Sequence, residues 1–219
     1  MANYSATSGK DFINGAPLEL NSLSDQTAVR EIIFIDNTVP DYENLLKGVE
    51  PGSQVILLDH TQDGVQQITQ ALQGKKFAAI HIVSHGSPGS IQLGTAQLSS
   101  TTLETKYSSL LQQWRDSLTE EADILLYGCN VAAGSSGQAF VNQLSQITGA
   151  DVAASTNLTG NTAKGGDWNL EFATNKIEAP LAFSEAARQS YSSVLADFPI
   201  TESFQNATAP GWLLSLIHI

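Results

Sequence analysis

The run FAAIHIVSHGSPGSIQLG, from Phe77 to Gly94, carries the strongest architectural signal in the sequence. Its first part, Phe77 to Val83, is almost continuously apolar, and it leads into Ser84, His85 and Gly86. An unbroken apolar run bounded by glycine is typical of a strand buried on both faces, which is the usual state of a strand in a parallel sheet. The stretch therefore predicts a central strand that ends in a histidine.

Similar apolar runs recur along the chain and alternate with amphipathic segments. The further strands are expected at 31–35, 54–58, 123–127 and 151–154. Helices are expected at 41–47, at 63–72 with Asp63 as cap, at 101–118 with a capping box of Thr101 and Glu104, and at 138–147. Residues 91–98 suggest a small hairpin, and the alternation in 166–172 suggests an antiparallel edge arm. The pattern predicts an α/β fold, a three-layer α/β/α sandwich with a mostly parallel sheet and a small C-terminal antiparallel hairpin.

Composition limits the classes of partner and site. The chain has 219 residues, 42% of them apolar, which is enough for one full-sized core. Its net charge of -12 disfavours nucleic acid and anionic lipid as partners. No run of 18 apolar residues and no signal-peptide pattern occurs, so membrane insertion is not expected. The single cysteine, Cys129, excludes an internal disulfide framework and a multi-cysteine metal site.

The residues that end the predicted strands are the candidates for chemistry, because ligands of parallel sheets bind beyond the carboxyl ends of the strands. These residues are Asp36, Asp59, His85 and Cys129. A thiol and an imidazole together provide a nucleophile and a base. We therefore expect Cys129 and His85 to meet at one edge of the sheet.

This pair predicts acyl-transfer chemistry. Cys129 would attack a carbonyl carbon, and His85 would take the thiol proton and later protonate the leaving amine. Gly86 has no side chain, so its backbone N–H can approach a substrate closely. Together with the N–H of Cys129 it would form an oxyanion hole.

Two sequence segments carry a resemblance to a known superfamily. Ile80–Gly86 is an apolar strand ending in His-Gly, and Ile124–Cys129 is an apolar strand ending in Cys. The chain resembles the caspase-like cysteine peptidases (clan CD), which include caspases, gingipains, separases and self-processing domains of bacterial toxins. SHGSPGSIQLG, LLYGCNVAAG, TGADVAASTNLTG and GGDWNLE resemble, more closely, an uncharacterised bacterial domain found near the start of large, repeat-rich surface or secreted proteins of cyanobacteria and marine bacteria.

The resemblance implies a caspase-like cysteine endopeptidase with a Cys129/His85 dyad. Its substrate would be a polypeptide, with the parent chain itself as one candidate, and it would act outside the cell or at its surface. The caspase motif Gln-Ala-Cys is replaced here by Tyr127-Gly128-Cys129, and no signature marks a third residue that orients His85. The alternative is a catalytically inactive caspase-like module that serves as a binding or scaffold domain in an adhesin-like protein.

Two further residues are candidates for substrate binding. In the superfamily, the residue ending the first strand often lines the pocket for the side chain before the cut, and Asp36 in that place would favour Arg or Lys. Asp36 could equally serve as a cap of the turn before Pro40. Ser155, after the fifth strand, would line the cleft.

Other chemistries lack their motifs. GxSxG, GxxxxGK and GxGxxG are absent, and no cofactor is expected. His81 lies two residues before the end of its strand, but without HExxH or another suitably spaced ligand it is interpreted as a core histidine, and no metal site is expected.

The ends of the chain differ in composition from its centre. Residues 1–28 are Ser-rich and polar and are expected to form a flexible lead-in, and 29–195 form the caspase-like domain. Residues 196–213 resemble the start of a further β domain that is cut off. Residues 214–219, LSLIHI, match a translated sequencing-library adapter and are excluded from the fold prediction.

Overall fold

The computed structural model describes residues 31–196. They form a central six-stranded sheet with strand order β2-β1-β3-β7-β8-β9. Its strands are β1 (Glu31–Asp36), β2 (Gln54–Leu58), β3 (Phe77–Val83), β7 (Leu118–Tyr127), β8 (Asp151–Ala154) and β9 (Phe172–Ala173). All neighbouring pairs are parallel except β8 and β9, which are antiparallel.

A separate antiparallel sheet has the order β4-β5-β6. It consists of β4 (Gly86–Ser87), β5 (Ser90–Leu93) and β6 (Ala96–Ser99). The hairpin expected at 91–98 is its β5–β6 pair, in which Ile91 lies opposite Leu98. Since β4 begins at Gly86, this sheet holds the backbone just beyond His85.

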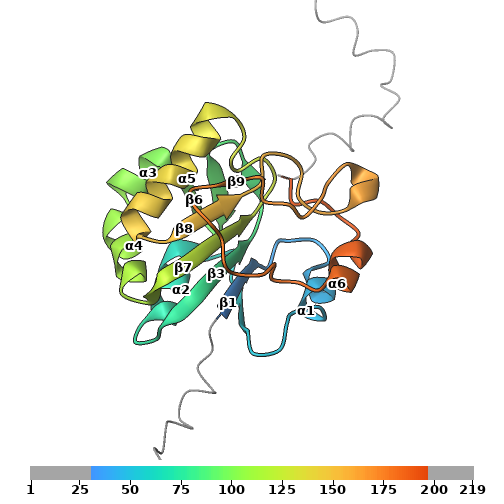
Figure 1. Ribbon diagram of the computed structural model, residues 1–219, viewed down its shortest axis with the longest axis horizontal. Helices are drawn as coiled ribbons and strands as arrows, with labels where there is room; N and C mark the ends of the chain where they lie inside the picture. Colours follow the sequence, from blue (N-terminus) through green and yellow to red (C-terminus); the bar gives the residue numbers. More distant parts are fainter. Residues whose placement is uncertain (1–30, 197–219) are drawn as a thin grey trace, which may run out of the picture.

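Helices cover both faces of the central sheet, as Figure 1 shows. They are α1 (Tyr42–Leu46), α2 (Gly64–Leu72), α3 (Ser100–Thr105), α4 (Ser108–Arg115), α5 (Gly134–Thr148) and α6 (Glu185–Ser190). Helices α2 to α5 lie together on one side, and α1 and α6 lie on the other. The predicted three-layer arrangement with a mostly parallel sheet is thus confirmed.

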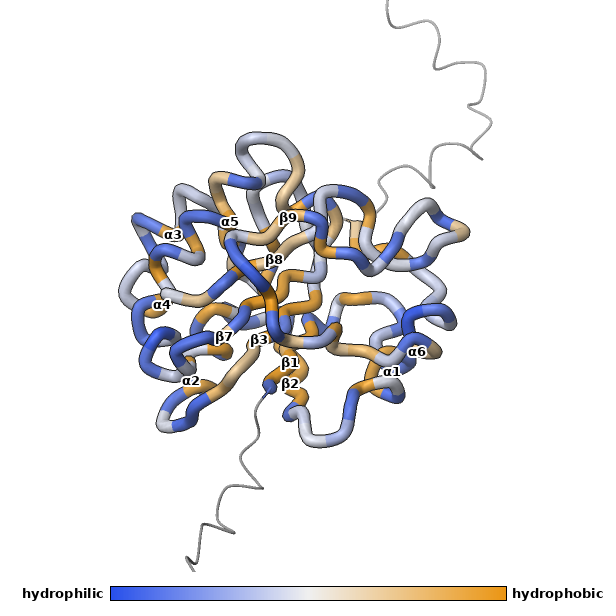
Figure 2. The backbone as a smooth tube through the Cα atoms, in the orientation of Figure 1, coloured by the Kyte–Doolittle hydropathy of each residue, from blue (hydrophilic) through white to orange (hydrophobic). Residues whose placement is uncertain are grey.

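The strands alternate their side chains between two apolar clusters. Ile32 and Phe34 of β1 point into the cluster under α2 to α5, whereas Ile33 and Ile35 point into the cluster on the α1 and α6 side. All four side chains are fully buried. Figure 2 shows the apolar strands in the middle of the molecule and hydrophilic stretches on the surrounding helices.

The second cluster is covered largely by the irregular chain after β8. Within it, the rings of Trp168 and Tyr191 meet edge to face with centroids 5.4 Å apart, and Trp168 and Phe183 do so at 5.7 Å. Aromatic pairs of this geometry contribute about 0.5–1.5 kcal/mol beyond the burial of their area. These ring contacts fix the chain after β8, which contains little helix or strand.

Two boundaries differ from the sequence prediction. The long helix expected at 101–118 is divided into α3 and α4, and its capping box is made by Ser99 and Thr102 in place of Thr101 and Glu104. Leu118, predicted on the helix, begins β7 opposite Phe77. The predicted lead-in at 1–28, the β domain predicted at 196–213 apart from Ala196, and the adapter-like end at 214–219 lie outside the described residues.

Candidate active site

The expected thiol and imidazole follow two neighbouring strands at matching positions. Strands β3 and β7 pair in parallel with Val83 opposite Tyr127, and His85 and Cys129 each lie two residues further on. The ladder continues past the strands, because the N–H of Ser84 donates to the carbonyl oxygen of Tyr127 at 3.0 Å. Sheet register therefore places the two residues at the same edge, as expected of residues that end parallel strands.

Both side chains are buried. Cys129 is 1% exposed and His85 is 6% exposed. The Sγ atom of Cys129 accepts a hydrogen bond from the N–H of Thr159 at 3.3 Å and lies 3.7 Å from the Thr159 carbonyl oxygen. Thr159 therefore holds Sγ through both of its backbone groups, with its N–H as donor and its carbonyl oxygen as acceptor of the thiol proton.

The imidazole of His85 faces carbonyl oxygens on both sides. Nδ1 lies 2.8 Å from the carbonyl oxygen of Ala196, and Nε2 lies 3.4 Å from that of Thr38. A carbonyl oxygen only accepts, so the ring nitrogen that carries a proton is the donor, and the contact of Nδ1 is the shorter of the two.

The backbone around the pair needs unusual conformations. A Cβ added at Gly86 would lie 2.6 Å from Cγ2 of Val131 and 2.8 Å from the carbonyl oxygen of Cys129, so only glycine fits. Asn130 follows the cysteine with φ 60°, in the left-handed region, and its N–H donates to the Asn157 carbonyl oxygen at 2.7 Å. Asparagine tolerates this region better than most residues.

The backbone N–H groups of Gly86 and Cys129 donate to one and the same acceptor. It is the carbonyl oxygen of Leu195, at 3.3 Å from the Gly86 nitrogen and 3.5 Å from the Cys129 nitrogen. Two N–H groups that converge on one carbonyl oxygen have the form of an oxyanion hole. Sequence reasoning named the two donors and missed the segment that supplies the acceptor.

Asp36 is placed differently from the expectation of a carboxylate open to a basic substrate side chain. It is fully buried, and Oδ1 accepts from the N–H and the hydroxyl of Thr38 at 3.0 and 2.6 Å. Its Oδ2 accepts from the N–H of Gly94 at 2.7 Å. The carboxylate therefore caps the turn after β1 and ties it to the β5–β6 hairpin.

Ser155 supports the loop behind the cysteine. It is fully buried, and its hydroxyl donates to the side-chain oxygen of Asn157 at 3.0 Å. The Ser155 carbonyl oxygen accepts from the N–H of Ala132 at 2.9 Å. Ser155 thus fixes the two loops that follow β7 and β8, and its hydroxyl is directed into that loop structure.

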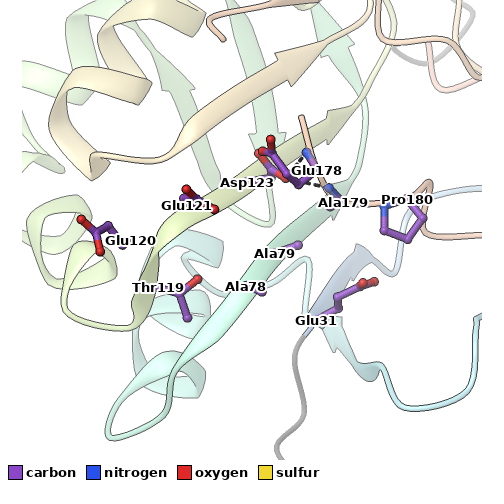
Figure 3. Close-up of a pocket in the computed structure, with 10 residues that line it drawn as sticks. All are labelled: Glu31, Ala78, Ala79, Thr119, Glu120, Glu121, Asp123, Glu178, Ala179 and Pro180. Carbon is purple, nitrogen blue, oxygen red and sulfur yellow. Dashed lines mark hydrogen bonds between the residues drawn. The ribbon is translucent and has the colours of Figure 1, made fainter. Parts of the chain in front are cut away.

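A large hollow lies at the other edge of the sheet. It has a volume of about 710 Å³ and is lined by residues at or near the amino ends of β1, β3 and β7 together with 178–180, as Figure 3 shows. It is rich in carboxylates, and those of Asp123, Asp151 and Glu178 have oxygens within 4.8 Å of one another. The thiol, the imidazole and the paired N–H groups lie at the opposite, carboxyl edge of the sheet.

Two buried polar side chains on the second face have structural roles. His81 is fully buried, with Nδ1 3.3 Å from the Tyr127 hydroxyl and Nε2 3.4 Å from the Glu31 carboxylate. The Tyr127 hydroxyl accepts from the N–H of Ala182 at 3.0 Å, and burial raises the pKa of Tyr127. This agrees with the interpretation of His81 as a core histidine.

Fold and site together define a class: an α/β protein in which a thiol and an imidazole end adjacent parallel strands. Residues 32–195 match the family model described as "Domain of unknown function (DUF4347)", and the chain belongs to that family. No curated protein matches the chain.

Among solved structures, a short chain dehydrogenase family protein from Francisella tularensis subsp. tularensis SCHU S4 is similar at 11% identity with a TM-score of 0.23. The match covers 54% of this chain and 60% of that protein's chain. Within residues 31–196, none of the helices is long and apolar enough to cross a membrane.

Proposed function

We propose that this chain is a cysteine endopeptidase of the caspase-like type, in which Cys129 is the nucleophile and His85 is the general base and acid. The observation that carries the proposal is the convergence of the Gly86 and Cys129 N–H groups on a single carbonyl oxygen, at the sheet edge where β3 and β7 end in His85 and Cys129. Such donors stabilise the oxyanion that forms when a thiolate attacks a peptide carbonyl, and removing one donor costs about 10²–10³ in kcat.

The same geometry supports a polypeptide as the substrate. The acceptor in the structure is a peptide carbonyl, so the site accommodates an extended polypeptide. The place of action that we propose, outside the cell or at its surface and within a larger adhesin-like protein, rests on the resemblance of the sequence motifs. The acidic net charge of -12 is compatible with that setting.

The test measures whether His85 activates Cys129. Because Cys129 is the single cysteine, alkylation by iodoacetamide followed by intact mass reports on one atom. A free thiol is only a few per cent thiolate at pH 7, so we expect His85→Ala to slow alkylation about tenfold or more. Because Nδ1 of His85 also contacts the Ala196 carbonyl oxygen, access to Sγ is measured separately for each chain as the alkylation rate at about pH 10, where a free thiol is ionised, and the rates at pH 7 are divided by it.

His60→Gln is the matched control, since His60 is exposed and its ring contacts the side chain of Asn37. It should leave the alkylation rate unchanged. Equal rates for wild type and His85→Ala at pH 7 would contradict the proposal and favour the inactive scaffold module.

A further inference from the structure

The segment 193–196 lies in the candidate active site in the manner of an added strand. The N–H of Leu195 donates to the Thr159 carbonyl oxygen at 2.9 Å, and the Ser193 carbonyl oxygen accepts from the N–H of Asn161 at 2.7 Å. Val194 pairs with Gly160 in an antiparallel bridge, and Ala196 pairs with Gly86 in a parallel one. Main-chain pairing of this kind is a common way for proteins to hold an extended peptide.

Gly160 makes the close approach of this segment possible. Its φ is 130°, and a Cβ added to it would lie 2.5 Å from the Ser193 carbonyl oxygen and 2.8 Å from Cα of Val194. The loop after β8 therefore has a glycine at the position where residues 193–195 cross it. Any larger residue there would collide with the backbone of this segment.

The side chain of Leu195 occupies an apolar pocket. It is fully buried within the cluster that also contains Cys129 and Tyr191. Burial of this apolar side chain away from water fixes the position of Leu195 along the segment. With Leu195 held there, its carbonyl oxygen lies between the two N–H donors, and the Ala196 carbonyl oxygen lies against Nδ1 of His85.

We propose that the peptide bond between Leu195 and Ala196 is the substrate of this site and is cleaved in cis. The inference rests on the proposed function, because it needs a reactive Cys129. It also assigns specificity: the residue before the cut is a buried apolar side chain, whereas Asp36 is engaged by Thr38 and Gly94.

The chemistry balances with one water molecule. The Cys129 thiolate attacks the Leu195 carbonyl carbon, and the Gly86 and Cys129 N–H groups hold the resulting oxyanion. When the tetrahedral adduct collapses, the bond to the Ala196 nitrogen breaks and that nitrogen takes a proton from His85. Water, deprotonated by His85, then hydrolyses the thioester. The products are a carboxylate on Leu195, a new amino terminus at Ala196 and the regenerated thiol.

The experiment uses the full chain of 219 residues and follows its intact mass after purification and incubation. Wild type should yield residues 1–195 and a fragment that begins Ala196-Asp197-Phe198 on amino-terminal sequencing. Cys129→Ala and His85→Ala should remain intact, with circular dichroism spectra that match the wild type. Cleavage at any other bond, or an identical product from Cys129→Ala, would overturn the inference.

Substitutions at the cut provide matched controls that leave the thiol and imidazole in place. Ala196→Pro should abolish cleavage, because a tertiary amide nitrogen cannot be positioned and protonated like a secondary one, whereas Ala196→Ser should be cleaved. Folding of each variant is checked by circular dichroism. Cleavage of Ala196→Pro at the same bond would contradict the assignment.

Cis action is tested by mixing. Cys129→Ala chains incubated with wild type should stay intact, since their own segment fills their own site; cleavage of these chains would contradict the cis assignment. Failure of the inference can be told from failure of the proposed function by the alkylation ratio. An intact wild-type chain with His85-dependent alkylation overturns only the assignment of Leu195–Ala196, whereas loss of that dependence overturns both.

Discussion

The carboxylate of Asp36 accepts hydrogen bonds within the turn after β1 and from the β5–β6 hairpin. It is therefore not available to bind a substrate side chain. Its two oxygens accept from Thr38 and Gly94, and no part of the residue is exposed. Both carboxylate oxygens are thus occupied as acceptors, so Asp36 serves the turn and the hairpin. The same residue type at the same strand end would serve a basic substrate only if one oxygen faced the cleft.

We predict that Asp36→Ala lowers stability. The substitution leaves the N–H groups of Thr38 and Gly94, both on half-buried residues, without their acceptor, and we expect a loss of about 1–3 kcal/mol in total. Urea unfolding followed by tryptophan fluorescence measures the change. Asp63→Asn is a comparison variant, because it also removes a charge from a turn but keeps an oxygen for the cap.

A stability loss below about 0.5 kcal/mol would argue against the buried structural role. In that case the expectation that Asp36 selects Arg or Lys gains weight. Cleavage of peptides with Lys or Leu before the cut, compared in wild type and Asp36→Ala, separates these two roles.

Strands could be predicted from the sequence more reliably than helix boundaries. The bounds of β2, β3 and β8 agree residue for residue with the expectation, because each is a short, mostly apolar run. The apolar spacing of 101–118 is compatible with one helix, but Leu118 is equally compatible with a strand. In the structure Leu118 pairs with Phe77 and belongs to β7. Such tertiary competition is not visible in local periodicity.

Only the part of the candidate site at the ends of the strands could be predicted from the sequence. His85, Gly86 and Cys129 follow apolar strands, and the topology of a parallel sheet brings strand ends together. Ser193 to Ala196 belong to a long segment with little regular structure. No periodic pattern of apolar residues therefore indicates their position in the site. The available signal was Val194-Leu195-Ala196, a short apolar stretch at the end of the polar segment after Tyr191.

At the scale of elements, Asp63 connects α2 to α4. Its Oδ1 accepts from the N–H groups of Val65 and Gln66 at 3.0 and 3.2 Å and so caps α2. Its Oδ2 accepts from the hydroxyl of Tyr107 at 2.9 Å, next to the start of α4. This contact gives a physical reason for the break between α3 and α4, because Tyr107 is fixed from outside the helix.

We predict that Asp63→Ala destabilises the fold by about 1–2 kcal/mol, since it removes an N-cap and the acceptor of a largely buried hydroxyl. Asp63→Asn should recover most of the loss, because asparagine caps helices about as well as aspartate. Thermal unfolding measures both. Equal losses for the two variants would show that charge, rather than capping, is the stabilising feature.

At the scale of the whole molecule, charge is distributed unevenly between the two edges of the sheet. The carboxyl edge holds the thiol and imidazole, and the amino edge holds the acidic hollow of Figure 3. There Oδ2 of Asp123 accepts from the N–H groups of Glu178 and Ala179 at 2.9 and 2.7 Å. Its Oδ1 is buried and has no hydrogen-bond partner among residues 31–196.

Desolvation raises the pKa of Asp123 above its usual value, and the charges of Glu178 and Asp151 add to this, although the two N–H donors oppose it. Because the folded state binds this proton more tightly than the unfolded state, ionised Asp123 costs stability at neutral pH. The cost falls as the pH is lowered through the raised pKa, and it is gone below the unfolded value of about 3.8.

We therefore predict that Asp123→Asn stabilises the chain at pH 7 and that its advantage over wild type shrinks as the pH falls towards 4. An asparagine oxygen can keep both backbone N–H bonds, while its NH₂ group replaces the unpartnered Oδ1 beside the other carboxylates. Urea midpoints measured from pH 7 to pH 4 in buffer with a chelator follow this difference without interference from bound cations. Asp123→Ala is the contrasting variant, since it removes the charge and the acceptor together and should be less stable than wild type at pH 7. An advantage of Asp123→Asn that stays constant with pH would mean that packing, and not the ionisation of Asp123, sets its effect on stability.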